Sequence, residues 1–369
     1  MPAGADASRT APKRPAPDLE RAVERGREEH ATVAGAVRAT RESALAHRAT
    51  LQRYNKAPVL APHPGPWNDP GRMERTSSER AVAALDPEHV AEWLAIPADE
   101  LPERSPLPLT ILPTSEDLYR HFARSIFDEA AEAHEAGDEL SLIVPLGPKG
   151  HYPLLAEMVN QARLSLEHVT FFGMDNWLDW QGRPLPLTHP FNLEGYFRRH
   201  FVELVEVELR PRDENVIFPS PLDLDRPAAE MERRGGVATT YGGFGFQGHL
   251  AFNEPPASRW TPITLGELRD STTRIVPLTV DTIIAHAQRS LGGNVFGVPP
   301  MAVTLGMREL LAAERIRLYT DGGAWKQTIL RILLFSEPSV DYPVTLVHDH
   351  PSVEVIVDAA SAAPPPDVW

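Results

Sequence analysis

The sequence predicts an α/β protein: a doubly wound, mostly parallel sheet with helices on both faces, preceded by a helical N-terminal extension. Short apolar runs alternate with helical patterns from about residue 106 onward, which is typical of a parallel sheet covered on both sides. Residues 18–55 are instead rich in Ala, Arg and Glu, with no proline. The length of 369 residues fits two domains, or one large α/β domain with an appendage.

The N-terminal part divides by composition. Residues 1–17 are rich in Ala, Pro and Arg and are expected to be a disordered tail. An extension over residues 18–105 follows, with helices predicted over 18–55 and 77–95. A Pro/Gly-rich linker at 57–72 separates them. We expect this extension to contribute helices and no strand.

The α/β domain is predicted to span residues 106–358, followed by a C-terminal tail over 359–369. Apolar runs bounded by turn residues mark the strands, and apolar residues at helical spacing mark the helices. The expected strands are 107–112, 140–146, 168–174, 216–218, 236–241, 316–319 and 344–347, and the first two helices are 115–136 and 152–164.

Composition excludes several functional classes. The absence of cysteine excludes disulfides, thiolate metal sites and a cysteine nucleophile. The net charge of −15 argues against a nucleic-acid-binding body, although the first 60 residues carry a net charge of +4. No run approaches the ~20 apolar residues of a membrane span, and the N-terminus lacks the apolar core of a signal peptide. We expect a cytoplasmic protein.

A glycine-rich loop follows the expected strand 236–241. Gly243, Gly245 and Gly248 match the dinucleotide-binding fingerprint formally. That fingerprint needs a helix that opens directly from the glycines and a ribose-binding acid about 20 residues further on. A polar loop that ends in proline follows instead, so the sequence does not predict NAD binding.

Directly after the glycines, His249, Asn253 and Glu254 lie within six residues. A carboxylate at this spacing can fix the tautomer of an imidazole, which then moves a proton near neutral pH. The alternative is a loop histidine with an ordinary hydrogen bond, and the spacing alone favours that alternative.

The segment Gly248–Pro255, GHLAFNEP, resembles the signature of the glucosamine-6-phosphate deaminase/isomerase family. The related 6-phosphogluconolactonases share the Gly-His pair but not Phe-Asn-Glu-Pro. The resemblance covers residues 106–358 and leaves out 1–105. Further segments that resemble the family follow in its order: Phe172–Asp175, Thr188–Pro190, Tyr196–Phe197, Thr273–Ile275, Ala302–Met307 and Gly323–Lys326.

The resemblance implies catalytic roles at the strand ends. Asp175 would shuttle a proton between C1 and C2 of an open-chain sugar, a task that suits a carboxylate whose pKa burial has raised. His249, oriented by Gln247 and Glu254, would open the pyranose ring.

The resemblance also implies a phosphate site. Arg274 and Lys326 match the family's phosphate-binding cations by position, an arginine offering a bidentate contact and a lysine a point charge. Lys149 lies in a loop that precedes a helix N-terminus, which favours anions. Glycines complete the predicted binding set: Gly147, Gly150, Gly245 and Gly248.

Three departures from the family pattern stand out. Gln247 occupies a position where the deaminases carry an acid, and glutamine can orient His249 but cannot compensate its charge. Asn176 replaces an acid that commonly follows Asp175. Lys149 and His151 replace small hydroxyl residues of the phosphate loop. We therefore expect a divergent member with an altered substrate or chemistry.

The sequence thus predicts an enzyme that isomerises an amino-sugar phosphate similar to glucosamine 6-phosphate and releases ammonia. An enolamine intermediate needs only acid–base groups, so neither a metal nor an organic cofactor is expected, and His348 with His350 is expected to be a structural pair. The expected partner is the small phosphosugar alone, with a homo-oligomer anticipated from the family.

Two alternatives stay open. A lactonase acting on a sugar-acid phosphate would share the fold, but Phe252–Pro255 argues against it. A regulatory protein that binds a phosphosugar without turnover is favoured by Gln247 and Asn176. All readings share one geometric expectation, the convergence of five side chains on a cleft at the strand ends: Asp175, His249, Glu254, Arg274 and Lys326.

Overall fold

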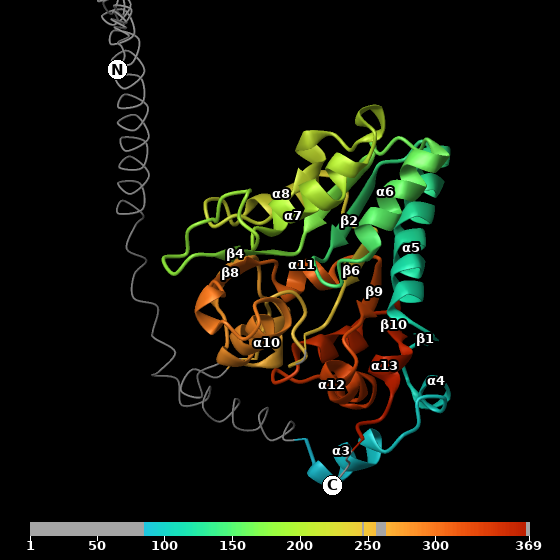
Figure 1. The fold of residues 1–369 in the computed structure, drawn as a ribbon, viewed down its shortest axis with the longest axis vertical. Helices are drawn as coiled ribbons and strands as arrows, with labels where there is room; N and C mark the ends of the chain where they lie inside the picture. The colour runs from blue at the N-terminus through green and yellow to red at the C-terminus, as the bar shows by residue number, and fades with distance from the viewer. Residues whose placement is uncertain (1–84, 246, 256–262, 367–369) are drawn as a thin grey trace, which may run out of the picture. The chain divides into compact units, whose positions relative to one another are not determined.

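The computed structural model describes residues 85–245, 247–255 and 263–366. Their centre is a seven-stranded sheet in the order β1-β10-β9-β6-β2-β3-β5 (Figure 1), and every neighbouring pair is parallel. The predicted fold class is therefore confirmed. The strands are β1 (Leu109–Leu112), β2 (Leu140–Val144), β3 (Val169–Gly173), β5 (Val216–Ile217), β6 (Thr239–Gly242), β9 (Arg315–Thr320) and β10 (Val353–Asp358).

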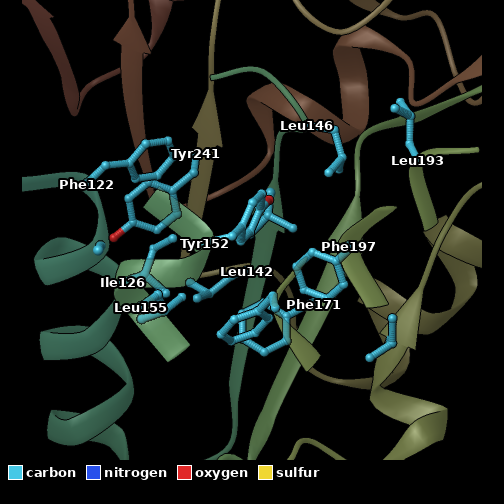
Figure 2. Close-up of a cluster of buried hydrophobic side chains, with 14 of the residues drawn as sticks. Phe122, Ile126, Leu142, Leu146, Tyr152, Leu155, Phe171, Leu193, Phe197 and Tyr241 are labelled. Carbon is cyan, nitrogen blue, oxygen red and sulfur yellow. The ribbon is translucent and has the colours of Figure 1, made fainter. Parts of the chain in front are cut away.

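Helices cover both faces of this sheet. Along β2, Leu142 belongs to one hydrophobic cluster and Ile143 to a second on the opposite face, because successive strand residues point to opposite sides. The first cluster contains residues of α5 (Ser115–Ala136), α6 (His151–Ala162) and α7 (Leu193–His200), and Figure 2 shows part of it. The second contains residues of α8 (Arg226–Arg233), α11 (Met307–Leu311) and α12 (Ala324–Phe335).

Helix α5 illustrates how local sequence sets an element. It spans the predicted residues, but its N-cap is Thr114, whose side chain accepts a hydrogen bond from the Asp117 amide. Gly137 ends it in the left-handed conformation, with a φ of 75°, which glycine adopts without strain. The ends of α5 are therefore set by residues just outside it.

The chain order creates a switch point at the middle of the sheet. From β2 the chain proceeds outward through β3 to β5 and then returns to β6 on the other side of β2. Ligands of open α/β sheets bind beyond the carboxyl ends of the strands at such a point. The loops after β2 and β6 meet there, since a Cβ on Gly243 would overlap the Gly147 carbonyl oxygen.

A small antiparallel sheet, which the sequence analysis did not predict as a unit, adjoins this end. It consists of β4 (Asp175–Leu178), β8 (Met301–Thr304) and β7 (Arg274–Pro277). Helix α10 (Val280–Ser290) lies between β7 and β8 in the chain. The remaining short elements are α9 (Leu265–Arg269), η2 (Val202–Leu204), η3 (Val207–Leu209), η4 (Asp213–Asn215) and η5 (Val295–Gly297).

One predicted strand is wrong. Residues 344–347 belong to the 3₁₀ helix η6 (Pro343–Asp349), and the strand is β10. The run Val344–Val347 is buried against α12, so its apolar character reflects burial rather than strand structure. A short apolar run alone does not distinguish a strand from a buried helical turn.

The two ends of the described chain meet at Arg331 of α12, which is fully buried. Its guanidinium donates to the carbonyls of Trp93 and Ile96 and to those of Ala362 and Ala363. These carbonyls follow or belong to α3 (Pro87–Leu94) and α13 (Ala359–Ala362), and α4 (Leu101–Arg104) lies between α3 and β1.

The predictions for residues 1–84 lie outside the described residues, and the domain boundary near residue 106 stays a prediction. Within the described part of the chain, residues 85–105 contain two helices, and the expected tail from residue 359 begins with α13. No helix in the described ranges is long and apolar enough to cross a membrane.

Candidate active site

A cavity of about 530 Å³ lies beyond the carboxyl ends of the strands. The loops after β2, β3, β6 and β9 line it, together with α10. A smaller cavity of about 50 Å³ adjoins it, lined mainly by α10. The residues that line both cavities are Gly245, His249, His286, Arg289 and Lys326. The switch point of the sheet thus carries a concave site, as the topology predicts.

The structure brings most of the predicted site residues together here. Seven of them line the larger cavity: Gly147, Lys149, Gly150, Asp175, Gly245, His249 and Lys326. The other four line neither cavity: Gln247, Gly248, Glu254 and Arg274. The convergence of Asp175 with His249 and Lys326 is therefore observed, while that of Arg274 is not.

Asp175 is the first residue of β4, two residues after the end of β3, and is buried with an exposed fraction of 7%. Burial raises its pKa to about 7, and the positive charge of Lys149 opposes that rise. Among the described residues its carboxylate has no hydrogen-bond donor from a side chain or the backbone. A carboxylate that is half ionised near neutral pH and faces a cavity can both accept and return a proton.

His249 lies between the cavity and Glu254. Its ring packs directly on Gly245, where any Cβ would overlap the imidazole, so this loop position requires glycine. Burial, together with the nearby charges of Lys326 and His286, lowers the pKa of His249 to about 3. The imidazole is therefore neutral at pH 7 and can accept a proton.

Glu254 lies close to His249 without a direct hydrogen bond to it. Its Oε1 lies 3.9 Å from His249 Nδ1, too far for a direct hydrogen bond, and both atoms are buried without a partner. Its Oε2 accepts a hydrogen bond of 2.7 Å from the amide of Thr279, the N-cap of α10. Glu254 thus connects the histidine loop to the start of α10.

Gln247 does not contact His249 in the way the sequence suggested. Its side-chain amide donates to Asp281, and its oxygen accepts a hydrogen bond of 3.2 Å from the Thr279 hydroxyl. Both partners lie at the N-terminus of α10. Gln247 therefore fastens α10 to the glycine loop, which is a structural reason for an amide at this position.

Arg274 lies on β7, outside the cavities, and donates to the Thr272 carbonyl at 3.3 Å. Its place among the cavity cations is taken by Arg289, on the last turn of α10, which lines both cavities. The helical spacing of Thr282, His286 and Arg289 puts all three on one face of α10. Sequence reasoning missed this face because only the elements around it reveal that it is turned toward the cavity.

Lys326 occupies the first turn of α12 and is buried. Burial and the charge of Arg289 lower its pKa to about 7, and the charge of Asp321 opposes this shift. Its ammonium donates to the Phe244 carbonyl. The adjacent Asp321, which also lines the larger cavity, accepts a hydrogen bond from the Tyr119 hydroxyl.

The two remaining departures also have local explanations. The Asn176 oxygen accepts hydrogen bonds from the Trp177 amide at 3.0 Å and the Leu193 amide at 2.9 Å. It therefore holds the start of α7 rather than facing the cavity. His151 is fully buried and stacked on Phe122 at 3.7 Å between ring centroids, outside the cavity lining.

The predicted glycines differ in role. Gly147 and Gly150 line the cavity, and a Cβ on Gly150 would overlap the Tyr119 ring. Gly248 has a φ of 75° and packs against Ile329 and Tyr342, so it shapes the loop instead of meeting the ligand.

The described residues contain no group of three or more His, Asp or Glu side chains placed to hold a metal ion. His348 and His350 each hydrogen-bond to backbone carbonyls, Leu333 for the first and Ala313 and Ser352 for the second.

Comparison with known proteins places this chain in a family. No family model matches the chain. A glucosamine-6-phosphate deaminase of Caenorhabditis elegans is 32% identical over 206 residues, covering 54% of this chain and 70% of the relative. The chain belongs to the glucosamine-6-phosphate deaminase family.

Another relative in the glucosamine-6-phosphate deaminase family, and a solved structure, match a larger share of the chain. The deaminase of Parabacteroides distasonis is 29% identical over 262 residues, which cover 69% of this chain and 90% of the relative. Among solved structures, a monomeric glucosamine-6-phosphate deaminase superposes with a TM-score of 0.58 at 24% identity, covering 69% of this chain and 98% of that one. This last likeness supports the fold.

Proposed function

We propose that this chain converts an amino-sugar phosphate of the glucosamine 6-phosphate type into the corresponding ketose phosphate and ammonia. The observation that carries the proposal is the meeting of Asp175, His249 and Lys326 in one cavity at the switch point of the sheet. The relatives are glucosamine-6-phosphate deaminases, and the three side chains supply a base, a ring-opening group and a phosphate-binding cation.

Ring opening falls to His249. Its neutral imidazole takes the proton of the anomeric hydroxyl and delivers it to the ring oxygen, which breaks the bond between C1 and that oxygen. Glu254, 3.9 Å from Nδ1, stabilises the imidazolium that forms between the two transfers. An open-chain aldose with its amine on C2 results.

Isomerisation falls to Asp175. Its carboxylate removes the proton from C2 while the C1 oxygen gains a proton, which gives an enolamine. Return of a proton to C1 gives an imine at C2, water adds to C2, and ammonia leaves with the C2 carbonyl formed. A pKa of about 7 suits both transfers, because a group with a pKa near the working pH accepts and donates comparably.

The phosphate fits the smaller cavity. Arg289 and Lys326 line it, and a guanidinium together with an ammonium provides bidentate and point-charge contacts to phosphate oxygens. Arg289 thereby takes the role that the sequence assigned to Arg274.

The test is a substrate panel with two readouts, ammonia and ketose. The full-length protein is incubated with glucosamine 6-phosphate, its C4 epimer, glucose 6-phosphate and a phosphorylated sugar lactone. Ammonia and ketose in equal amounts from an amino sugar are expected. Ketose from glucose 6-phosphate alone, or acid from the lactone alone, would replace the proposal with isomerase or lactonase activity. Binding of amino-sugar phosphate without any product would favour a regulatory protein.

A further inference from the structure

Three buried polar atoms lie next to the proposed ring-opening group and its carboxylate. They are His249 Nδ1, Glu254 Oε1 and the Thr282 hydroxyl oxygen, and none of them has a hydrogen-bond partner among the described residues. Buried polar atoms are nearly always paired in folded proteins, because an unpaired one is costly. Three such atoms in one place therefore indicate a role beyond the stability of the fold.

Thr282 belongs to the first turn of α10 and is fully buried. Its amide donates to the hydroxyl of the N-cap residue Thr279 at 3.4 Å, and the Thr279 amide donates to Glu254 Oε2 at 2.7 Å. Burial raises the pKa of Glu254, and the Thr282 side chain is the neighbour that opposes this rise most. One helical turn thus holds the Thr282 hydroxyl close to the carboxylate and leaves Oε1 for a second partner.

The two nitrogens of the His249 ring have different surroundings. Nε2 is the ring atom that a Cβ on Gly245 would meet first, and Gly245 lines both cavities. Nδ1 is buried and lies 3.9 Å from Glu254 Oε1, and Thr282 lines the smaller cavity together with His249. Nε2 is therefore the nitrogen placed to meet a substrate, while Nδ1 is placed to meet side chains of the protein.

One arrangement of protons gives all three atoms a partner. An ionised carboxylate only accepts hydrogen bonds, whereas a hydroxyl group donates one and can accept another. A chain of donors from His249 Nδ1–H to the Thr282 oxygen, and from the Thr282 hydroxyl to Glu254 Oε1, satisfies every atom. In the opposite direction the hydroxyl proton would go to Nδ1, and Oε1 would have no donor.

Building on the proposed function, we propose that Thr282 is a positioning residue whose hydroxyl links His249 to Glu254 in the complex with substrate. The link keeps the proton of the neutral imidazole on Nδ1 and leaves Nε2 free to take the proton of the anomeric hydroxyl. Hydrogen bonds of catalytic groups commonly tighten when substrate binds, so a separation of 3.9 Å between Nδ1 and Oε1 leaves room for this closure. Because Gln247 is bonded to α10 instead of to His249, Thr282 supplies the orientation that position 247 does not.

Kinetics of the full-length protein with glucosamine 6-phosphate form the first part of the test. Thr282→Val removes the hydroxyl and keeps the shape, and we expect kcat for ammonia release to fall about tenfold or more, as loss of a charged hydrogen bond implies. KM should change less than about threefold, and Thr282→Ser should retain at least about a third of the wild-type kcat because it keeps the hydroxyl.

Thr240→Val is the matched control. It makes the same change at a buried threonine of β6, whose hydroxyl donates to the Leu310 carbonyl at 2.9 Å outside the lining of both cavities. Its kcat should equal that of the wild-type protein. A wild-type kcat in Thr282→Val, or an equal loss in Thr240→Val, would overturn the inference.

Nitrogen NMR of protein labelled at the histidine rings is the second part, because protonated and unprotonated ring nitrogens have well separated chemical shifts. The probe is 2-amino-2-deoxyglucitol 6-phosphate, which has no aldehyde and cannot react, and the signal lost in His249→Gln identifies His249. We expect the proton on Nδ1 in the wild-type protein and in Thr282→Ser, and a mixture of both tautomers in Thr282→Val. A proton on Nε2 in the wild-type protein, or a tautomer unchanged in Thr282→Val, would overturn the inference. Failure of every amino-sugar phosphate to yield ammonia would sink the proposed function alone, since the tautomer is measured without turnover.

Discussion

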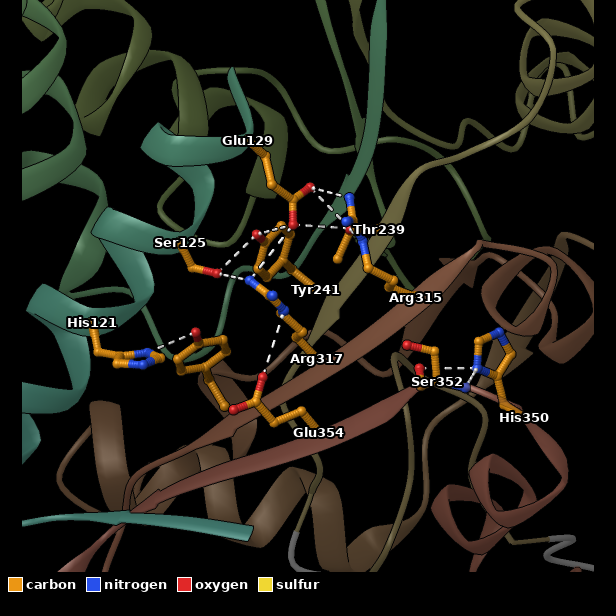
Figure 3. A network of polar contacts seen from close by, with 11 residues as sticks. His121, Ser125, Glu129, Thr239, Tyr241, Arg315, Arg317, His350, Ser352 and Glu354 are labelled. Atoms are coloured by element: carbon orange, nitrogen blue, oxygen red, sulfur yellow. Dashed lines mark hydrogen bonds and ion pairs between the residues drawn. The ribbon is translucent and has the colours of Figure 1, made fainter. Parts of the chain in front are cut away.

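Two buried carboxylates at opposite ends of the sheet have opposite surroundings. Glu129 of α5 is 8% exposed and lines a polar groove at the amino ends of β6 and β9. Its carboxylate accepts hydrogen bonds from Thr239 and Tyr241 and pairs with two arginines at 3.3 and 3.6 Å (Figure 3). Asp175 is 7% exposed and has only the electrostatic influence of Lys149.

This contrast distinguishes a buried carboxylate that stabilises the fold from one that is available for proton transfer. Burial of a charge is tolerated when hydrogen bonds and opposite charges surround it, which is the condition of Glu129. Asp175 lacks such partners, so burial raises its pKa to about 7. Burial alone therefore does not identify a functional carboxylate; burial beside a cavity without partners does.

The largest expected effect is on turnover through Asp175. Asp175→Asn keeps the shape but removes the base, so we expect kcat for ammonia release to fall by about 10²–10⁴-fold, the usual contribution of a general base. Because the pKa of Asp175 is raised from 3.8 to about 7, its ionisation lowers the stability of the folded state as the pH rises between these values, and the full loss is present above pH 7. The variant should therefore melt at the same or a higher temperature at pH 8, and a large loss of Tm there would contradict the comparison.

Glu129 should show the reverse behaviour. Glu129→Ala leaves Arg315 and Arg317 without their shared carboxylate. Because these arginine side chains are 41% and 29% exposed, we expect a loss of about 1–3 kcal/mol, the cost of leaving hydrogen-bonding groups without a partner, rather than that of a fully buried ion pair. Chemical denaturation should reveal this loss, while kcat of the folded fraction stays near the wild-type value. The control is Arg124→Ala, which removes an exposed pair with Asp128 at 3.7 Å worth at most about 1 kcal/mol.

The sequence predicted most of what depends on local pattern and motif. Apolar periodicity predicted the parallel sheet and helix α5. The segments that resemble the family, Gly248–Pro255 among them, pointed to Asp175, His249 and Lys326 as site residues. The cavity arginine could not be predicted, because the position of Arg289 in the cavity wall depends on how α10 packs against it. Arg274 carries the matching motif but lies on the small antiparallel sheet.

The pH profile offers a third test of the chemical site. The ascending limb of kcat/KM should follow ionisation of Asp175, with its pKa of about 7. The descending limb should follow loss of the proton from Lys326, whose pKa is also about 7. We expect a narrow maximum near pH 7 that declines by about tenfold per pH unit on each side. Lys326→Arg should remove the alkaline limb, because guanidinium stays charged; a flat profile from pH 6 to 8 would contradict these assignments.

The smallest expected effect concerns Gln247. The family pattern suggests that an acid at this position would assist His249, but the structure places Asp281 against the Gln247 amide. Gln247→Asp would set two carboxylates together at the start of α10, and we expect kcat/KM to fall several-fold rather than rise. The double variant Gln247→Asp with Asp281→Asn exchanges amide and carboxylate and should recover most of the loss. A gain from the single variant would restore the orienting role that the sequence suggested.

The hydrogen-bond partners of Gln247 could not be predicted from the sequence. Its position two residues before His249 suggested contact with the imidazole, yet in a loop that folds back on α10 the nearest partners come from residues 279 and 281. Side-chain partners across a loop depend on tertiary placement, which spacing along the chain does not encode. The wrong strand prediction at 344–347 has the same cause. Its apolar residues are buried against α12, and this tertiary contact cannot be told from a strand pattern in the sequence.

The guanidinium of Arg331 has a consequence for engineering. It binds carbonyls from residues 93 and 96 as well as from 362 and 363, so both ends of the described chain converge on one helix. Close ends are what circular permutation requires. In a chain shortened to residues 85–366, joining these two ends across Arg331 and opening new ends in the exposed turn at Gly292 and Gly293 would place the new ends just after the helix that carries Arg289. Arg331 would then hold together two segments in the interior of the permuted sequence. Reporter domains could be fused to the new ends beside the cavity.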